Sequence, residues 1–278
     1  MRASFAKQEA PLIVDVIRER NIRDVTAAIR NGQYNGAMAY DLHLSCLDEA
    51  CKNREAIRAM LAATEKPVLA LNYNQTYSYE QFRTTEQQRV DLLLSAAEAG
   101  ASAVDIQAYT YDYDAKERFQ EEYAPRAAPF VQARPKEIAL NPQIIRKQQE
   151  LIAQLHSMGT EVLMSCHTDV PMDCQQVVSL ALALEQRGLD VVKIVTRCEN
   201  DRQLIEAFKT MLELKMAVKK ARIHYHCQGK RGKLTRIVNP MLGAYLVFCT
   251  ERYTHSSNYE QLHLKTSSEA FRTLDWRQ

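Results

Sequence analysis

Apolar and polar positions alternate in blocks along this chain. Short runs of β-branched and apolar residues are followed by longer segments with helical spacing, and this pair of patterns recurs eight times. Strict alternation of such strands with helices predicts a parallel sheet that is covered by helices. The predicted strands lie at 12–17, 36–44, 67–74, 103–109, 161–168, 191–198, 221–227 and 245–250.

The segments between these strands have the spacing of amphipathic helices. In the segment 173–187, for example, Val177, Leu180, Ala181 and Leu184 share one helical face. Glycines that fall shortly before a strand, as a helix C-cap does, are Gly100, Gly159 and Gly188. The clearest predicted helices lie at 48–64, 84–100, 142–157, 173–187 and 199–219.

Eight strand and helix units in 278 residues predict one domain, a (β/α)8 TIM barrel over residues 1–278. An open, doubly wound sheet is the rival, but it more often has five to seven strands and a glycine-rich first turn, whereas the first turn here reads RERN. One irregular insertion, 110–140, follows the predicted strand 103–109. We expect it on the active face of the barrel, as a lid, an oligomer contact or a solvated excursion.

Composition narrows the class of protein and of partner. Hydrophobic residues make up 46% and charged residues 25%, which is the mixture of a soluble globular protein. The net charge of +2 is spread along the chain, so neither nucleic acid nor a membrane surface is expected as a partner, and a small molecule is. The apolar run LIVDVI near the N-terminus is too short for a signal segment or a membrane span, which favours a cytoplasmic location.

The cysteines give a further indication of the compartment. Seven cysteines, an odd number without a repeated CxxC spacing, are scattered along the chain, and four of them lie in predicted strands. We expect reduced, buried thiols, as in a cytosolic protein.

The most informative residue for chemistry is Lys193, which stands inside the predicted strand 191–198. It shares a face with Val191 and Val195, because side chains alternate along a strand. If that face is buried, desolvation disfavours the ammonium form and leaves an amine that can attack a carbonyl. The alternative is a lysine that reaches solvent from the strand end or pairs with a carboxylate.

His167 ends the preceding predicted strand, 161–168, on the same face as Ser165. An imidazole can take and return a proton near neutral pH, so His167 could serve as a proton shuttle. A structural histidine at a strand end is the alternative. Because neighbouring strands would bring His167 and Lys193 to the same molecule, the catalytic interpretation gains weight.

The stretch 161–274 contains four recognisable elements: EVLMSCH, VVKIVTR, GKRGKLTRIVNPMLGAYLVF and SSNYEQLHLKTSSEAFRTL. With them the stretch resembles type I 3-dehydroquinate dehydratase, since they are similar to that family's histidine strand, lysine strand, Ser/Thr-Arg pair and Ser-x-x-x-Gln loop. In the N-terminal half only the order of strands and helices persists. The motif residues fall on His167, Lys193, Thr235 with Arg236, Phe248, and Ser257 with Gln261.

The resemblance implies a hydro-lyase of the shikimate pathway, hence of aromatic amino acid biosynthesis. Lys193 would form a Schiff base with a keto acid, His167 would move the proton, and Arg236 would hold the carboxylate. Ser257 and Gln261 would bind substrate from a closing loop. No metal or organic cofactor would be required, and a homodimer is one assembly that stays open.

The second predicted strand departs from the family pattern, Glu-x-Arg-x-Asp, whose members contact substrate hydroxyls and orient the histidine. The matching positions hold Ala39, Asp41 and His43. Further along, Tyr73 or Asn74 stands in place of a family arginine, and Gln107 in place of an acidic residue. The substrate can therefore differ from 3-dehydroquinate, or other residues restore the lost contacts: Arg18, Arg20 or the 110–140 insertion.

Three other functions stay open on the sequence. A Schiff-base aldolase would keep Lys193 but break a carbon–carbon bond. A metal-dependent barrel enzyme could use His and carboxylate side chains from several strand ends, and a homologue without activity could bind a related metabolite. The candidate metal ligands are Asp41, His43, His167, His224 and His226.

Overall fold

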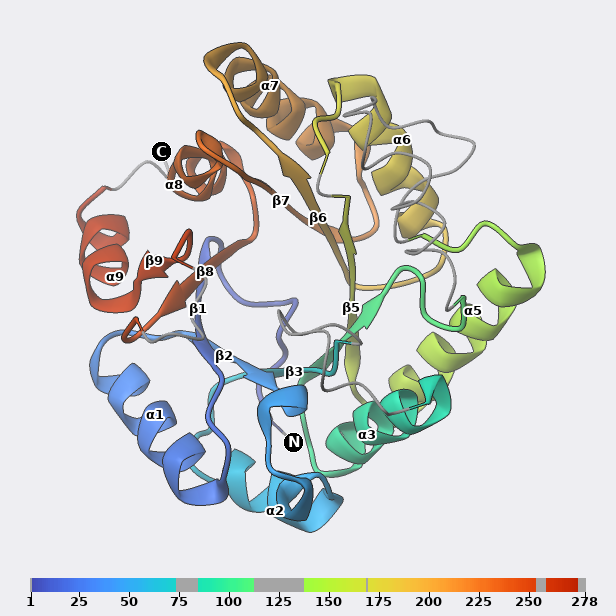
Figure 1. Cartoon of the computed structure of the whole chain (residues 1–278), viewed down its shortest axis with the longest axis vertical. Coiled ribbons are helices and arrows are strands. Elements are labelled where there is room, and N and C mark those ends of the chain that lie inside the picture. The colour runs from blue at the N-terminus through green and yellow to red at the C-terminus, as the bar shows by residue number, and fades with distance from the viewer. Residues whose placement is uncertain (1, 74–84, 113–137, 169, 254–258, 275–278) are drawn as a thin grey trace. The chain divides into compact units, whose positions relative to one another are not determined.

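The structure is a computed structural model, and it describes residues 2–73, 85–112, 138–168, 170–253 and 259–274. Its described elements alternate between strand and helix (Figure 1). The strands are β1 (Leu12–Ile17), β2 (Ala39–His43), β3 (Val68–Leu71), β4 (Ala103–Gln107), β5 (Glu161–His167), β6 (Val191–Arg197), β7 (Arg222–Gln228), β8 (Leu246–Thr250) and β9 (Leu262–His263). The eight predicted strands are thus confirmed in number and order, although several are shorter than predicted, and the two-residue β9 is an addition to them.

The helices follow the strands that they cover. They are α1 (Ile22–Tyr34), α2 (Arg54–Leu61), α3 (Glu86–Glu98), α5 (Pro142–Ser157), α6 (Cys174–Glu185), α7 (Asp201–Ala217), α8 (Gly232–Leu242) and α9 (Leu264–Thr273), with two short 3-10 turns, Leu44–Cys46 and Glu49–Cys51. The face predicted for α6, Val177, Leu180, Ala181 and Leu184, is buried. No helix among these described segments is long and apolar enough to cross a membrane.

The predicted helix 48–64 is wrong in its first part. Residues Glu49–Cys51 form a 3-10 turn, and α2 begins only after Asn53, whose side chain accepts a hydrogen bond from the N–H of Ala56. A side-chain cap of this kind fixes the first turn of a helix. The start of α2 is therefore set by the cap rather than by the apolar spacing.

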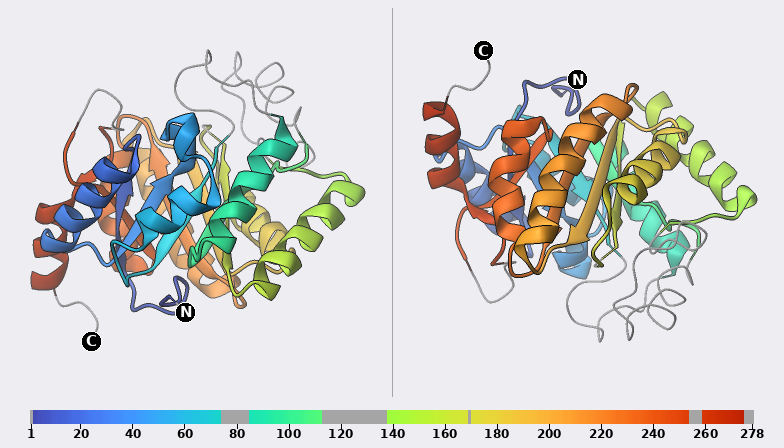
Figure 2. Two further views of the ribbon diagram at one scale, coloured as in Figure 1. Left: turned by 90° about the horizontal axis from the view of Figure 1, so that it is seen from below. Right: turned by 90° about the horizontal axis from the view of Figure 1, so that it is seen from above.

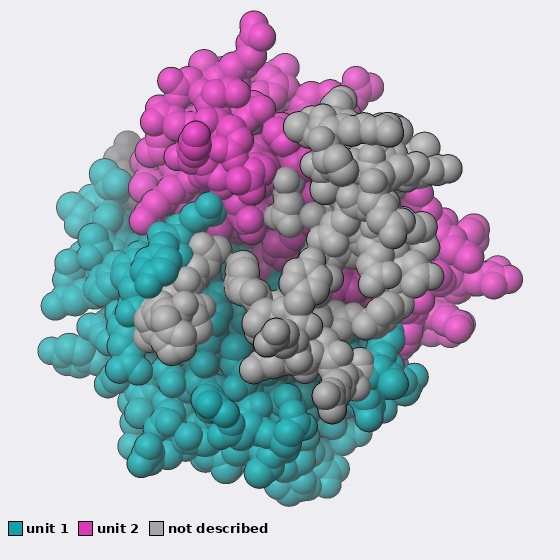
Figure 3. All heavy atoms as spheres, in the orientation of Figure 1, with its two compact units in different colours: residues 1–105, 155–161, 247–278 teal, residues 106–154, 162–246 magenta. Residues whose placement is uncertain are grey.

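The chain divides into two compact units, shown in different colours in Figure 3. Unit 1 contains residues 1–105, 155–161 and 247–278, and unit 2 contains residues 106–154 and 162–246. Within unit 1, parallel pairs join β1 to β2, β2 to β3, β3 to β4 and β8 to β9. Within unit 2, β6 pairs in parallel with both β5 and β7.

Helices pack against the strands inside each unit. In unit 1, α1 and α9 contact β1, and α3 contacts β3; in unit 2, α6 contacts β6, and α7 and α8 contact β7 (Figure 2). The helix ends follow the predicted chemistry, because Gly100, Gly159 and Gly188 have φ of +98°, +76° and +88°. Such left-handed conformations favour glycine.

The cysteine prediction holds in part. All seven cysteines are free, but Cys46, Cys51 and Cys174 are only half-buried, so the predicted burial is wrong for these three. They lie outside the strands, whereas the four buried thiols lie in strands or directly after them. The prediction that residues 110–140 form an insertion on the active face concerns a segment that lies largely outside the described residues.

Candidate active site

Six side chains of unit 2 share one face of the strands β5, β6 and β7. The register places Ser165 beside Lys193, and Lys193 beside His224. Two residues further toward the carboxyl ends, His167 lies beside Val195, and Val195 beside His226. Because residues two apart on a strand point to the same side, these six form two adjacent rows on one face.

This face is the one turned away from helix α6. On the opposite face, the sulfur of Met164 lies 3.9 Å from a guanidinium nitrogen of Arg187, which follows the C-cap residue of α6. Lys193 is only 6% exposed and Ser165 is fully buried. The side chain of Lys193 is therefore buried on this face and does not extend into solvent from the strand end.

His224 and His226 form a buried pair beside Lys193. Nε2 of His224 lies 2.8 Å from Nδ1 of His226, and the ring centroids are 5.0 Å apart. Burial lowers the pKa of both imidazoles well below the usual value, and the charges of Lys193 and Arg236 lower it further. Both imidazoles are therefore neutral at neutral pH.

Arg236 is positioned by the start of helix α8, which follows β7. Thr235 Oγ accepts a hydrogen bond from the N–H of Cys227 (2.8 Å) and donates one to the carbonyl of Gly232 (2.6 Å). This threonine holds the first turn of α8 against the end of β7. Arg236 is 7% exposed, and its charge acts on both imidazoles of the histidine pair. The structure thus brings Lys193, His167 and Arg236 into one unit around this pair.

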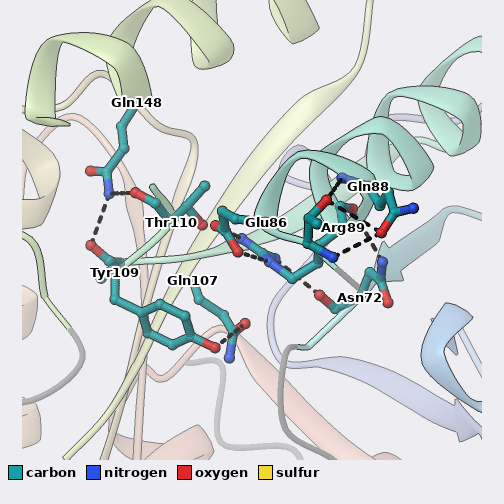
Figure 4. A network of polar contacts seen from close by, with 10 residues as sticks. Asn72, Glu86, Gln88, Arg89, Gln107, Tyr109, Thr110 and Gln148 are labelled. Atoms are coloured by element: carbon teal, nitrogen blue, oxygen red, sulfur yellow. Dashed lines mark hydrogen bonds and ion pairs between the residues drawn. The ribbon is translucent and has the colours of Figure 1, made fainter. Parts of the chain in front are cut away.

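The chain after β4 is held from several sides in unit 2. Tyr109 donates a hydrogen bond to the side-chain oxygen of Gln107 (2.6 Å), and Gln148 donates to the carbonyls of Ala108 (3.0 Å) and Thr110 (2.7 Å) (Figure 4). Gln107, which stands where the family has an acidic residue, is 3% exposed. The hydrogen bond from Tyr109 thus orients the buried side-chain amide of Gln107.

Arg187 completes this support and was not singled out in the sequence. Its guanidinium donates to the carbonyls of Ala108 (3.1 Å) and Ala139 (2.7 Å) and to the side-chain oxygen of Gln148. Burial lowers its pKa to about 10. The amide N–H of Ala139 also donates to the carbonyl of Ala108 (2.9 Å), so both ends of the segment between them are joined.

In unit 1, a second group of polar side chains lies on β2 and β4 and just after β3. Asp41 is 2% exposed, with Oδ2 3.5 Å from Nε2 of His43 and Oδ1 buried without a hydrogen-bond partner. Tyr73 donates a hydrogen bond to Asp105 (2.7 Å), and its ring centroid lies 6.4 Å from that of His43. Asp105 was missed, although a lone carboxylate in the apolar run AVDIQAY was a visible signal.

Figure 4 also shows how the residue before Tyr73 is held. Arg89 of α3 donates to the carbonyl of Asn72 (3.0 Å), and the amide of Asn72 donates back to the carbonyl of Arg89 (3.1 Å). Two further nitrogens of Arg89 contact the carboxylate of Glu86 at 2.8 and 2.7 Å. Arg89 is 1% exposed, so this bidentate pair fixes the end of β3 from inside the unit.

The other predicted binding residues lie in unit 1 or outside the described residues. Gln261 is 6% exposed, and it accepts hydrogen bonds from Arg18 (3.1 Å, side chain) and Tyr253 (2.6 Å, carbonyl). Ser257 lies outside the described residues. Two arginines, Arg18 and Arg20, were considered as replacements for the family's missing contacts with substrate. Arg20 is exposed and pairs with Asp48 at 2.7 Å, whereas Arg18 contacts Gln261, so Arg18 is the better candidate.

The metal alternative gains no support within the described ranges. There, no group of three or more His, Cys, Asp or Glu side chains is arranged to hold a metal ion. The histidine pair consists of two imidazoles that bond to each other, and Asp41 has one histidine neighbour.

The family model for type I 3-dehydroquinase matches residues 137–276. A search of curated protein sequences found no match. Among solved structures, a 3-dehydroquinate dehydratase from Geobacillus kaustophilus is similar, with a TM-score of 0.72 at 12% identity over 99% of this chain and 98% of the other.

Two further structures extend the comparison. A type I 3-dehydroquinate dehydratase from Clostridium difficile with covalently modified comenic acid has a TM-score of 0.74 at 14% identity, over 96% of this chain and 93% of the other. A deoxyribose phosphate aldolase from Aeropyrum pernix has a TM-score of 0.50 at 13% identity, over 95% and 91%. At these identities the likeness concerns the fold, and it confirms the predicted (β/α)8 barrel class.

Proposed function

Because the chain belongs to the type I 3-dehydroquinase family, we propose that it is a hydro-lyase that forms a Schiff base between Lys193 and the ketone of a keto acid. The observation that carries this proposal is the burial of Lys193 in one row with Ser165 and His224, next to the row of His167. A lysine with so little contact with water is suited to nucleophilic attack on a carbonyl.

The proposed reaction proceeds in four steps. The amine of Lys193 attacks the ketone, water leaves, and a protonated imine forms. His167 removes a proton from the carbon next to the imine carbon, and the imine accepts the electron pair. The proton then passes to the departing hydroxyl, which leaves as water, and a second water hydrolyses the imine. Arg236 holds the substrate carboxylate, because its fork of donors suits bidentate binding.

The substrate proposed is a keto acid other than 3-dehydroquinate. The positions at which the family recognises substrate hydroxyls hold Ala39, Asp41 and His43. Loss of several charge-assisted hydrogen bonds would weaken binding of the original polyol by on the order of several kcal/mol. Arg18, which donates to Gln261, is a candidate for a replacement contact.

Trapping with borohydride tests the imine. The protein is incubated with 3-dehydroquinate and with simpler cyclic and short keto acids, borohydride is added, and the intact mass is measured. We expect an adduct whose added mass is that of the bound keto acid minus one oxygen atom, because imine formation removes water and reduction adds two hydrogens. It should be located on Lys193 by peptide mapping and be absent in Lys193→Ala. The matched control is Lys209→Ala, which removes an exposed lysine of α7 in the same unit. An adduct that persists in Lys193→Ala, or none with any keto acid, would contradict the proposal.

Product analysis separates loss of water from cleavage of a carbon–carbon bond. The likeness to an aldolase concerns the fold alone, and an imine serves both reactions. A hydro-lyase gives a conjugated product of the same carbon count, whereas an aldolase gives two shorter carbonyl compounds, which NMR distinguishes. Tight binding without turnover would identify instead a homologue that binds a metabolite.

A further inference from the structure

The pair of buried imidazoles on β7 has no role in the reaction proposed above. His224 and His226 are 3% and 4% exposed, on the same strand face as Lys193. Val191 and Val195 occupy the same face of the neighbouring strand, so an apolar side chain fits this environment. Two polar rings in such a place cost desolvation that valine or leucine would avoid, which points to a chemical reason for their presence.

The hydrogen bond between the rings determines what the pair can do. One nitrogen of each neutral imidazole carries hydrogen and the other accepts. Because Nε2 of His224 and Nδ1 of His226 bond to each other, two outer nitrogens remain. In either tautomer, one outer nitrogen is an acceptor and the other is a donor. A proton that enters at one end therefore releases a different proton at the other end.

The register gives this pair a direction. His224 lies beside Lys193 on adjacent strands, which are about 4.8 Å apart in a sheet. His226 lies one row nearer the carboxyl ends, in the row of His167, and the charge of His167 acts on it. The pair thus extends from the neighbourhood of the nucleophile to that of the proposed proton shuttle.

We propose that His224 and His226 form a bifunctional proton-transfer pair for imine formation and hydrolysis at Lys193, an inference that rests on the proposed function. Attack of the amine on the ketone gives an adduct with a positively charged nitrogen and a negatively charged oxygen. The pair takes one proton from that nitrogen at one end and gives another to the oxygen from the other end. The adduct becomes a neutral carbinolamine. Protonated His167 then gives its proton to the hydroxyl, which leaves as water, and neutral His167 becomes the base of the next step; hydrolysis of the product imine returns this proton to His167.

The cycle balances over one turnover. Imine formation moves a proton from nitrogen to oxygen and switches the tautomer of the pair. Hydrolysis of the product imine moves a proton from oxygen to nitrogen and restores the first tautomer. The pair never carries a net charge during either transfer. This agrees with the low pKa of both rings, since burial and the charges of Lys193 and Arg236 oppose an imidazolium there.

The test measures how fast the adduct on Lys193 appears. Wild type and the variants His224→Gln and His226→Gln are mixed with the keto acid that gives an adduct and quenched with borohydride at increasing times. A glutamine amide retains polarity but does not exchange tautomers easily. We expect the adduct to form about 100-fold more slowly in both variants, the typical scale of acid–base catalysis. The dissociation constant of the keto acid should change by less than about threefold.

A matched control lies between the two histidines. Tyr225 points to the opposite face of β7, where its hydroxyl bonds to Thr196 of β6 (3.0 Å). The variant Tyr225→Phe removes this hydroxyl. We expect its rate of adduct formation to equal that of wild type. Slowing in Tyr225→Phe comparable with that in the histidine variants would indicate a general disturbance of β7 and overturn the proposal.

A measurement on wild type alone covers the case in which the glutamine variants do not fold. The rate of adduct formation is followed in mixtures of H2O and D2O. If two protons move together in the transfer, the rate of adduct formation should fall along a curve as the deuterium fraction rises. A straight line would overturn the pair mechanism. If the adduct forms in the histidine variants at the wild-type rate, the pair is structural and the proposed function stands. If wild type gives no adduct with any keto acid, both proposals fail.

Discussion

Asp15 is a buried carboxyl group of β1 that should make the stability of this protein depend on pH. It is 1% exposed, and burial, with a smaller contribution from the charge of Glu251, raises its pKa from 3.8 to about 8. The side chain lies beside Gly32 of α1, where an added Cβ would overlap its carboxyl oxygen. The folded protein therefore holds the neutral acid at pH 7, whereas the unfolded chain holds the carboxylate.

The direction and the size of the pH effect on stability follow from this difference in protonation. A raised pKa in the folded state means that the full stability exists below the unfolded pKa and is lost as pH rises toward the folded pKa. Between pH 3.8 and pH 7 the difference grows over about three pH units, at about 1.4 kcal/mol per unit. The free energy of unfolding should thus fall by roughly 4 kcal/mol through this one group.

Asp15→Asn isolates the effect, because asparagine has nearly the same shape and does not ionise. The free energy of unfolding is measured by urea denaturation of both proteins from pH 4 to pH 8.5. The variant should gain on wild type steadily up to about pH 8. In the control Asp24→Asn the difference from wild type should stay nearly constant over this range. Contacts with Arg23 and Asn21 lower the pKa of that exposed carboxylate, so its contribution changes only at more acidic pH. A difference between wild type and Asp15→Asn that stays constant over this range would refute the reasoning.

Three further substitutions test the support of the two units by urea denaturation. Arg89→Met should cost about 3–5 kcal/mol, because it leaves the carboxylate of Glu86 without its bidentate partner, and the added change Glu86→Gln should recover part of the loss. Arg187→Met should cost about 2–4 kcal/mol, since buried carbonyls lose their donor; an unchanged midpoint would show that they find another. Gly36→Ala should cost about 2 kcal/mol or more, because φ is +92° and the new Cβ would overlap the hydroxyl of Ser268; equal stability would mean that α9 can shift at no cost.

Much of the fold could be predicted from the sequence because local signals and long-range packing agree. The buried face of α6 follows from spacing alone, and Gly100, Gly159 and Gly188 mark helix ends because few other residues adopt their conformation. The strand 36–44 was predicted too long at its start. Gly36 there has φ of +92°, which a strand does not accommodate, so β2 begins at Ala39.

The candidate site was harder to predict, since its contacts join residues far apart in the sequence. Lys193 and His167 could be named from their strands and from the family motif. The bond between His224 and His226 could not, because an H-x-H spacing places two rings on one face without orienting them. Likewise, an arginine such as Arg187 reads as a surface residue at a helix end until its carbonyl acceptors, which lie 48 and 79 positions away, are known.

The joined ends of the segment after β4 have a consequence for evolution and design. Ala108 and Ala139 are hydrogen-bonded to each other, and Arg187 bridges their carbonyls. The distance that any intervening sequence has to span is therefore set by the scaffold and does not change with the length of that sequence. The entropy of closing a connection between two fixed points grows only slowly with its length, so a change in the number of residues between these two anchors should cost little. This position is thus where a lineage could acquire a new specificity element, or an engineer graft one, while strand register stays intact.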